Sequence, residues 1–265
     1  MRFFACAAGL AACLAATPAA AEDLREFCPD RPGLGTPACT MDRGHAAVEL
    51  GLFDWTLERS GGDRTDTFQA GDLLVRYGVT DSLEVQLGWT AFGAVRDRAG
   101  GMVDKASGVG DLLVALRQNL RNPDGSGFSA AIMPYATLPA GGAAIGAGDW
   151  GAGLILPVSY ELPGGFALGF TGSVDAAVDE DRHGRHMSFG GVAGLDIPLG
   201  EAAGATVELA AVRDRDPAGS STQFLAGLSG ALMVGSELQL DAGANVGLNR
   251  SAPDVELYFG LARRF

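Results

Sequence analysis

The stretch LDAGANVGLN, residues 240–249, alternates without a break between apolar residues and polar or small ones. In an extended chain Leu240, Val246 and Leu248 would share one side, and Asp241 and Asn245 the other, because successive side chains of a β-strand point to opposite faces. The stretch therefore predicts a strand with two unlike faces. How often the pattern recurs decides the fold class.

The same period of two runs along the chain from residue 44 onward. SLEVQLGWTA at 82–91 and FALGFTGSVDAAVD at 166–179 show it clearly, whereas no stretch of comparable length has a convincing 3.6-residue period. The first segment is the least regular, because its apolar side switches near Leu52 and Phe53, which predicts a β-bulge. We expect about twelve strands, at 45–58, 67–79, 82–94, 108–120, 127–138, 149–162, 166–179, 187–199, 205–213, 222–234, 238–248 and 255–265.

Composition excludes one class of partner. The 265 residues are 47% hydrophobic and carry a formal net charge of −13, with Lys105 as the only lysine. A chain this acidic would repel the phosphate backbone, so we expect no nucleic-acid partner.

The first residues have the layout of a secretory signal peptide, which we expect to span 1–21. One Arg precedes an apolar run, and small residues stand before Glu22, so that cleavage is expected after Ala21. A lipoprotein processing box at 10–13 is the less favoured alternative.

The cysteines left after this cleavage predict a disulfide. Cys28 and Cys39 stand eleven positions apart in an exported segment rich in Pro and Gly, which indicates pairing. No CxxC motif or nearby His suggests a metal, so we expect no metal site. The N-terminal segment 22–43 then precedes a β-domain at 44–265.

The connections between the expected strands favour a membrane barrel. Compact turns alternate with mostly longer and more polar links, and the strand number is even, as in bacterial outer-membrane barrels with both termini in the periplasm. Alternation alone is equally compatible with a soluble sandwich. The aromatic residues of the apolar faces distinguish the two, because they gather at the strand ends, as rings do at the two membrane interfaces. The outer set is Trp89, Trp150, Phe189 and Phe224, and the periplasmic set is Tyr77, Phe128, Tyr160, Phe166 and Phe265.

These observations predict an all-β fold: a closed antiparallel transmembrane β-barrel of about twelve strands, with a short disulfide-stapled N-terminal segment. Twelve strands ~4.8 Å apart and tilted by about 40° give a backbone radius of roughly 12 Å. The width of this lumen is intermediate between that of a small barrel with a packed interior and that of a large barrel with an open channel.

The polar faces of the strands supply the candidate lumen-lining residues. Acids dominate among them, which would select against anions. The set is Asp72, Arg76, Glu84, Asp111, Arg117, Glu161, Asp175, Asp196, Glu208, Asp241 and Glu256. Two interpretations stay open: a narrow pore for a small neutral or cationic solute, and a closed lumen filled by paired charges. For residues 22–43 we favour a stapled tail before the first strand, with a plug in the periplasmic mouth as the alternative.

One feature suggests an enzyme instead. His186 and Ser188 have the His-x-Ser spacing of outer-membrane phospholipases, which are twelve-stranded barrels. Phe189 occupies the Asn position of that motif, the pair has inward parity, and no third group to orient His186 is evident. We therefore expect no enzyme activity, no catalytic residue and no cofactor, and treat a lipid hydrolase as the least favoured alternative behind a structural or surface-interaction barrel.

Several stretches together resemble a known family. They are FCPDRPGLGTPACTMDRGHAAVELGLFDWTLER at 27–59, GVGDLLVALRQNL at 108–120, AIMPYATLPAG at 131–141 and the terminal Phe265. They resemble proteobacterial outer-membrane barrels grouped with a protein of the phenol-degradation meta pathway and regarded as transporters. The resemblance implies a place in the bacterial outer membrane and transport of an unknown small solute. The terminal aromatic resembles the assembly signal read by the barrel-insertion machinery, so the expected partners are that machinery, outer-membrane lipid and the solute.

Overall fold

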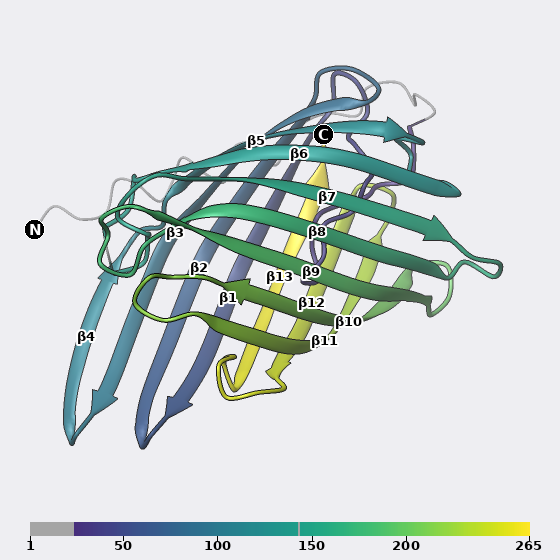
Figure 1. The fold of residues 1–265 in the computed structure, drawn as a ribbon. Helices are drawn as coiled ribbons and strands as arrows, with labels where there is room; N and C mark the ends of the chain where they lie inside the picture. Colours follow the sequence, from purple (N-terminus) through teal and green to yellow (C-terminus); the bar gives the residue numbers. More distant parts are fainter. Residues whose placement is uncertain (1–23, 143) are drawn as a thin grey trace, which may run out of the picture.

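The computed structural model describes residues 24–142 and 144–265 as one large sheet curled into a barrel (Figure 1). The expected signal peptide lies outside the described residues. The strands are β1 (Ala46–Ser60), β2 (Asp63–Gly78), β3 (Leu83–Ala99), β4 (Met102–Gly108), β5 (Leu112–Arg121), β6 (Phe128–Leu138), β7 (Gly151–Glu161), β8 (Ala167–Val178), β9 (Arg185–Pro198), β10 (Ala203–Asp214), β11 (Ser221–Val234), β12 (Leu238–Gly247) and β13 (Val255–Arg264). Within these ranges no helix is long and apolar enough to span a membrane.

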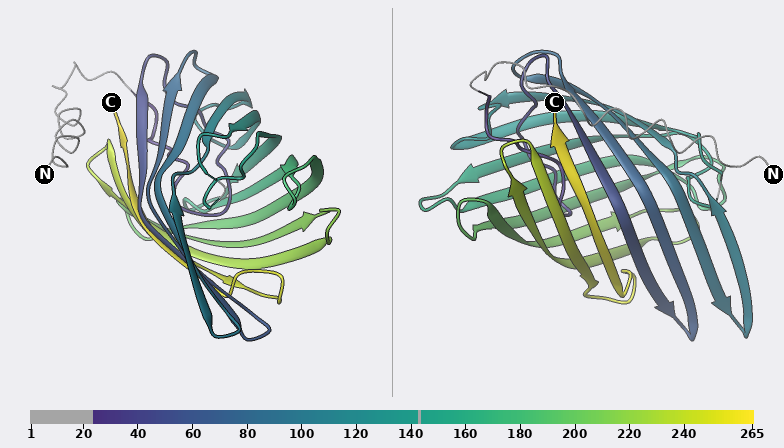
Figure 2. Two further views of the ribbon diagram at one scale, coloured as in Figure 1. Left: turned by 90° about the vertical axis from the view of Figure 1, so that its left-hand side faces the viewer. Right: turned by 180° about the vertical axis from the view of Figure 1, so that it is seen from behind.

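The barrel is closed and antiparallel, with twelve strand positions. Apart from β4 and β5, which do not pair with each other, strands that are neighbours in sequence are paired, and β1 pairs with β13 to complete the ring (Figure 2). The thirteenth strand adds no position, because β4 and β5 both pair with β3, β4 along residues 93–99 and β5 along residues 83–89. The expected all-β closed barrel is confirmed.

The predicted β-bulge is present in β1. Its register against β13 shifts between Gly51 and Phe53, where one extra residue enters the strand. Beyond the bulge, Phe53 stacks on Phe259 with ring centroids 5.5 Å apart. The bulge therefore explains why the apolar side of this segment switches in the sequence.

Two connections expected to be loops are instead long hairpins, so the prediction was wrong for 60–66 and 95–107. β1 and β2 are joined by Gly61 and Gly62, and β3 and β4 by Gly100 and Gly101, all with positive φ. Two-residue loops with positive φ at both positions match the twist of paired strands. Charged residues on both faces hid the alternation here. The two hairpins project beyond the other strands (Figure 1).

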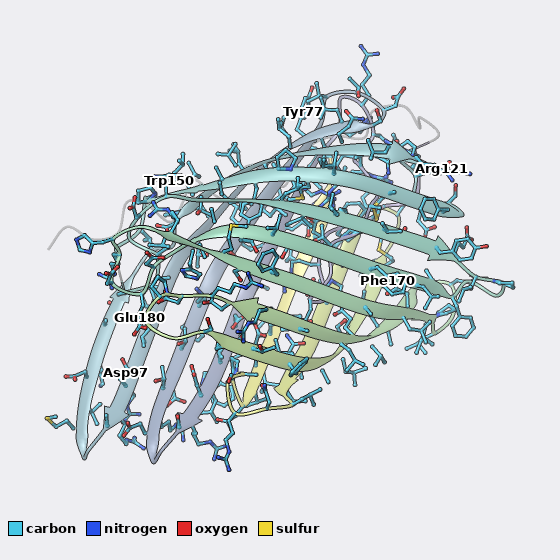
Figure 3. All side chains as sticks on the ribbon, in the orientation of Figure 1. Tyr77, Asp97, Arg121, Trp150, Phe170 and Glu180 are labelled. Carbon is cyan, nitrogen blue, oxygen red and sulfur yellow. A yellow bond between two sulfur atoms is a disulfide. The ribbon has the colours of Figure 1, made fainter. Side chains whose placement is uncertain are left out.

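The barrel is apolar outside and polar inside. Phe170 lies on the outer wall, while Trp150 and Arg121 lie toward its opposite ends (Figure 3). Apart from Phe265, the aromatic residues predicted for the two interfaces keep 37–51% of their surface exposed. By contrast, Arg76, Arg117, Glu49 and Glu84 are completely buried. This inverted distribution is typical of a barrel that faces lipid.

Candidate functional site

The N-terminal segment lies inside the barrel and forms a plug, which we define as residues 24–43. Its backbone and side chains bond to inward residues of β1, β2, β3, β5, β8, β10 and β12 (Figures 1 and 2). The favoured expectation, a tail before the first strand, was therefore wrong, and the alternative of a plug fits these bonds.

A buried ionic cluster forms the first anchor of the plug. Arg76 lies 3.0 Å from Glu84, 3.1 Å from Glu49 and 3.1 Å from Asp30 of the plug. Arg117 lies 2.6 Å from Asp30 and 3.2 Å from Glu84. Three carboxylates thus share two guanidinium groups, and of the five side chains only Asp30 retains some contact with solvent, with 17% of its side chain exposed. Removing one member of such a cluster strongly destabilises the fold, because the remaining charge would stay buried and unpaired.

The same cluster holds the backbone of the plug. Arg76 donates to the Cys28 carbonyl at 2.7 Å, and Arg117 donates to the Cys39 carbonyl at 3.2 Å. Burial acts to raise the pKa of Asp30, but the guanidinium groups of Arg117 and Arg76 outweigh it and hold that pKa below its usual range. The Asp30 carboxylate is therefore charged when it bonds to the cluster.

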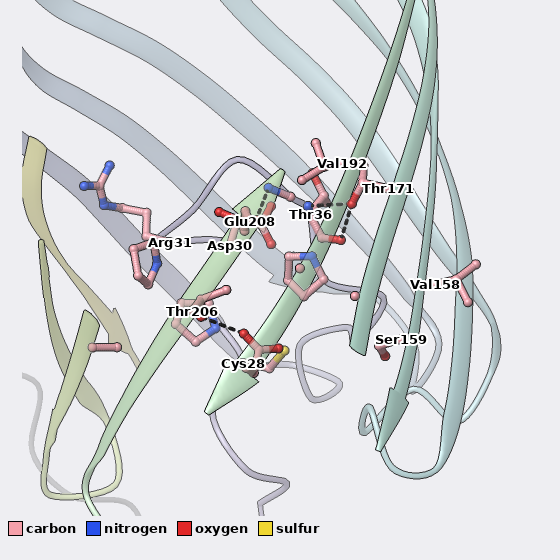
Figure 4. Close-up of a pocket in the computed structure, with 18 of the residues that line it drawn as sticks. Cys28, Asp30, Arg31, Thr36, Val158, Ser159, Thr171, Val192, Thr206 and Glu208 are labelled. Atoms are coloured by element: carbon pink, nitrogen blue, oxygen red, sulfur yellow. Dashed lines mark hydrogen bonds between the residues drawn. The ribbon is translucent and has the colours of Figure 1, made fainter. Parts of the chain in front are cut away.

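The predicted disulfide is confirmed and closes the loop that carries the second anchor. Cys28 and Cys39 are bonded. Within that loop, the Leu34 and Gly35 amides donate to the Glu208 carboxylate at 2.7 and 2.8 Å. The Thr36 amide donates to a threonine hydroxyl on β8 at 2.9 Å (Figure 4). This side of the plug is thus held by a carboxylate and a hydroxyl of the opposite wall.

A third contact lies between the two anchors. Arg31 of the plug donates to both carboxylate oxygens of Asp241, at 3.3 and 2.9 Å. Its guanidinium also lies over the Tyr258 ring, with 5.7 Å to the centroid. The plug therefore bonds to the wall on several sides of the lumen.

A cavity of about 270 Å³ remains between the plug and one part of the wall (Figure 4). Pro32 and Pro37 of the plug border it on one side. Strands β7 to β10 supply the other side, with the apolar Val192 and the hydroxyl-bearing Ser159 and Thr171 among the lining residues. The lumen is consequently filled on one side and hollow on the other.

The structure divides the predicted lumen residues into two groups. Arg76, Glu84, Arg117, Glu208 and Asp241 meet around the plug, as described above. The other six bond elsewhere: Asp72 to Thr90, Asp111 to the amides of Gly141 and Ala147, Glu161 to the amide of Gly127, Asp175 to Tyr135, Asp196 to Thr206 and Glu256 to Asn245. Asp111, in the GVGD stretch, therefore fixes the connection after β6.

Sequence reasoning missed Glu49, which accepts the amides of Asp30 and Arg31 at 2.9 Å each. The available signal was a carboxylate between the apolar residues Val48 and Leu50. The switch of faces at the bulge obscured it. Asp30 was not recognisable as a ligand of lumen arginines, because nothing in the sequence alone places the plug in the lumen.

His186 has the partners that sequence reasoning did not find. Its Nδ1 lies 3.0 Å from Asp179 and 3.3 Å from Asp216, and its Nε2 lies 3.0 Å from Asp214. Hydrogen bonds from the amides of residues 218 and 180, and then the nearby imidazole, lower the pKa of Asp216. The expectation that His186 lacks an orienting group was therefore wrong.

These partners do not complete a hydrolase site. Both ring nitrogens of His186 face carboxylates, and in the described part of the chain no hydrogen bond joins His186 to Ser188. One potential metal-ligand atom from each of His186, Asp179 and Asp216 lies within 4.8 Å of the others. Because the imidazole is already in contact with both carboxylates, we assign no metal to them.

Two solved structures share this fold at low sequence identity, and a third is less similar. The β-domain of the Bordetella autotransporter BrkA is 12% identical, with a TM-score of 0.56, over 84% of this chain and 100% of that one. The translocator domain of autotransporter NalP from Neisseria meningitidis is 14% identical, with a TM-score of 0.50, over 84% and 88%. The CymD monoaromatic hydrocarbon channel is 11% identical over 84% and 88%, with a TM-score of 0.47. A search of curated proteins found no match.

These likenesses concern the fold alone. A closed barrel with an apolar outer wall and this fold places the protein in the bacterial outer membrane. The model of one protein family, described as "Putative MetA-pathway of phenol degradation", matches residues 29–265. The chain therefore belongs to that family of outer-membrane barrels.

Proposed function

We propose that the protein conducts a small solute passively through its lumen, past the plug, without a cofactor. The observation that carries this proposal is the cavity between the plug and strands β7 to β10. It lies where a pathway through the barrel would pass, and the wall there combines apolar contacts with hydroxyl groups.

The charges of the lumen favour neutral or cationic solutes. The two arginines of the buried cluster, Arg76 and Arg117, are taken up by carboxylates. Asp54, Asp72 and Glu256 face the lumen on the other side of the bulge, near one another. Acids along a narrow pathway repel anions and concentrate cations.

Conductance in planar bilayers tests the proposal. We expect the chain from Glu22 onward to give small, cation-selective currents, and removal of residues 24–43 to increase them. A heat-dependent gel shift would first establish that the shortened barrel is folded. Silence of both folded proteins would refute conduction.

The family description makes a small aromatic alcohol the first solute to test. Phenol that occupies the cavity should block part of the cation current in the full chain. The block should disappear when the plug is removed, because one side of the cavity is then missing.

A barrel with a filled lumen is the second candidate, and the buried ionic cluster favours it. In that case the outer hairpins would carry the function by contact. Two folded but silent proteins would support this alternative. Deacylation of phospholipid that is lost in Ser188→Ala would instead identify a hydrolase.

A further inference from the structure

The two projecting hairpins separate positive from negative charge on their two faces. Phe53 marks the outward face, since it stacks on Phe259, whose sequence neighbour Tyr258 points into the lumen toward Arg31. Phe68 and Phe92 continue this outward face across β2 and β3, with centroid distances of 5.4 and 6.3 Å. Next to these rings, farther out on the same face, lie five cations that we call the basic patch: Arg59, Arg64, Arg96, Arg98 and Lys105.

The strand register places these cations directly beside one another. Arg59 is opposite Arg64, and Arg64 is opposite Arg98, so three arginines form one row across β1, β2 and β3. In the adjacent row, Arg96 is opposite Lys105, the only lysine of the chain. Like charges opposite each other across a sheet repel at a Cβ separation of about 5 Å. An anion bound beside these cations would reduce the repulsion.

The protein neutralises only part of the basic patch. Asp66 binds Arg64 at 2.6 Å, and Asp254 lies 3.4 Å from Arg59. Asp66 is also directly opposite Arg96 and attracts it electrostatically. Among the described residues, no side chain forms a hydrogen bond or ion pair with Arg98 or Lys105, and none forms a hydrogen bond with Arg96.

The remaining acids of the hairpins face the other way. Asp97 and Asp104 are opposite each other on the lumen side, where Thr65 donates to Asp97 at 2.7 Å (Figure 3). They cannot reach across the sheet to neutralise the outward cations. The hairpins therefore carry their cations on the outward face and most of their acids on the lumen face.

A groove of about 390 Å³ runs along this outward face between β2, β3 and β4. Arg96 and Lys105 line its outer part together with Asp66, whose carboxylate is paired with Arg64. Phe68, Ala94 and Ser107 line the part nearer the rest of the barrel. The groove is therefore cationic at the end that faces water and mostly apolar at the end that faces the membrane. A lipid with an anionic head group has the same two-part character.

We propose that the basic patch binds the phosphate groups of the phosphorylated glycolipid, lipid A, in the outer leaflet. One phosphate would lie between Arg96 and Lys105, with Arg98 beside it, because guanidinium and ammonium groups are the preferred protein ligands of phosphate. The first carbons of an acyl chain would pack against Phe68. Basic pockets at the membrane boundary recognise anionic head groups in this way.

Lipid binding by the purified full chain in detergent tests the proposal. The probes are lipid A with both phosphates and the same acylated disaccharide with its phosphates removed, with retention measured by native mass spectrometry. We expect wild type to bind the phosphorylated probe at least ten times more tightly than the dephosphorylated one. The difference should decrease as salt is added.

Two variants distinguish binding by the basic patch from a general effect of positive charge on the protein. The triple variant Arg96→Gln, Arg98→Gln, Lys105→Gln should lose at least tenfold in affinity for lipid A. The matched control Arg121→Gln removes an exposed cation at the opposite end of the wall and should bind as wild type. Equal affinity of wild type and the triple variant, or equal affinity for both probes, would overturn the proposal. Preference for an anionic polysaccharide without lipid would overturn it as well.

Discussion

Replacing Glu208 with Ala should release one side of the plug while the barrel stays intact. The Glu208 side chain is largely buried and accepts the amides of Leu34 and Gly35 at 2.7 and 2.8 Å. Hydrogen bonds to a charged group contribute about 1.5–3 kcal/mol each. Because water from the adjacent cavity can solvate the freed amides, we use the lower figure, which gives about 3 kcal/mol for the pair. That free energy corresponds to about a hundredfold larger population of the detached loop.

Hydrogen exchange of individual amides measures this population. In Glu208→Ala, the amides of Leu34 and Gly35 should exchange about a hundredfold faster, while amides of the strands should keep their wild-type rates. The matched control is Asp196→Ala, which removes a carboxylate that borders the same cavity but bonds to Thr206 of the wall. Wild-type protection of Leu34 and Gly35 in Glu208→Ala would refute the anchoring argument. Equal loss of protection in the control would show that the charge of the lumen, and not the bonds to the plug, sets the exchange rate.

Three further predictions concern the disulfide, an ion pair and the last residue. Serine at Cys28 and Cys39 should weaken docking of the plug by about 3 kcal/mol, seen as faster exchange of its amides with no change in barrel melting. The hydrogen bond from Arg264 holds the pKa of Glu237 below its usual 4.5, so the pair should stabilise the barrel above that pH and lose its contribution as pH falls through the lowered value. The difference in melting temperature between wild type and Glu237→Gln should therefore be constant from about pH 7 to pH 5 and shrink below it. Deletion of Phe265 should lower the fraction of chain that is folded in the outer membrane, and normal assembly would contradict its role as a signal.

The barrel itself was predictable because its cause is local. Lipid outside and water or polar groups inside require every spanning strand to alternate, and a period of two is visible in a single sequence. The terminal segment with Leu257, Phe259 and Leu261 was therefore recognisable as a lipid-facing strand. Even the bulge near Leu52 left a readable sign, because it shifts the apolar residues by one position.

The plug and the projecting hairpins were not predictable on the same grounds. Outside the membrane both faces of a strand meet water, so both faces carry polar residues. The segments around Arg96 and Lys105 therefore show no alternation of apolar and polar residues in the sequence. The position of the plug depends on pairing between Asp30 and Arg117, which are 87 residues apart. Such long-range pairing leaves no periodic trace.

The plug also connects the two ends of the barrel wall. Glu49 of β1 accepts two of its amides, Arg264 of β13 donates to the Arg25 carbonyl, and Asp241 of β12 binds Arg31. The seam between the first and last strands is thus tied across its inner side by a segment that precedes β1 in the chain. A sideways opening into the membrane at this seam would have to break these ties together with the strand pairing. A solute that enters the lumen should consequently leave along the axis of the barrel, and the segment that narrows the path also keeps the ring from opening.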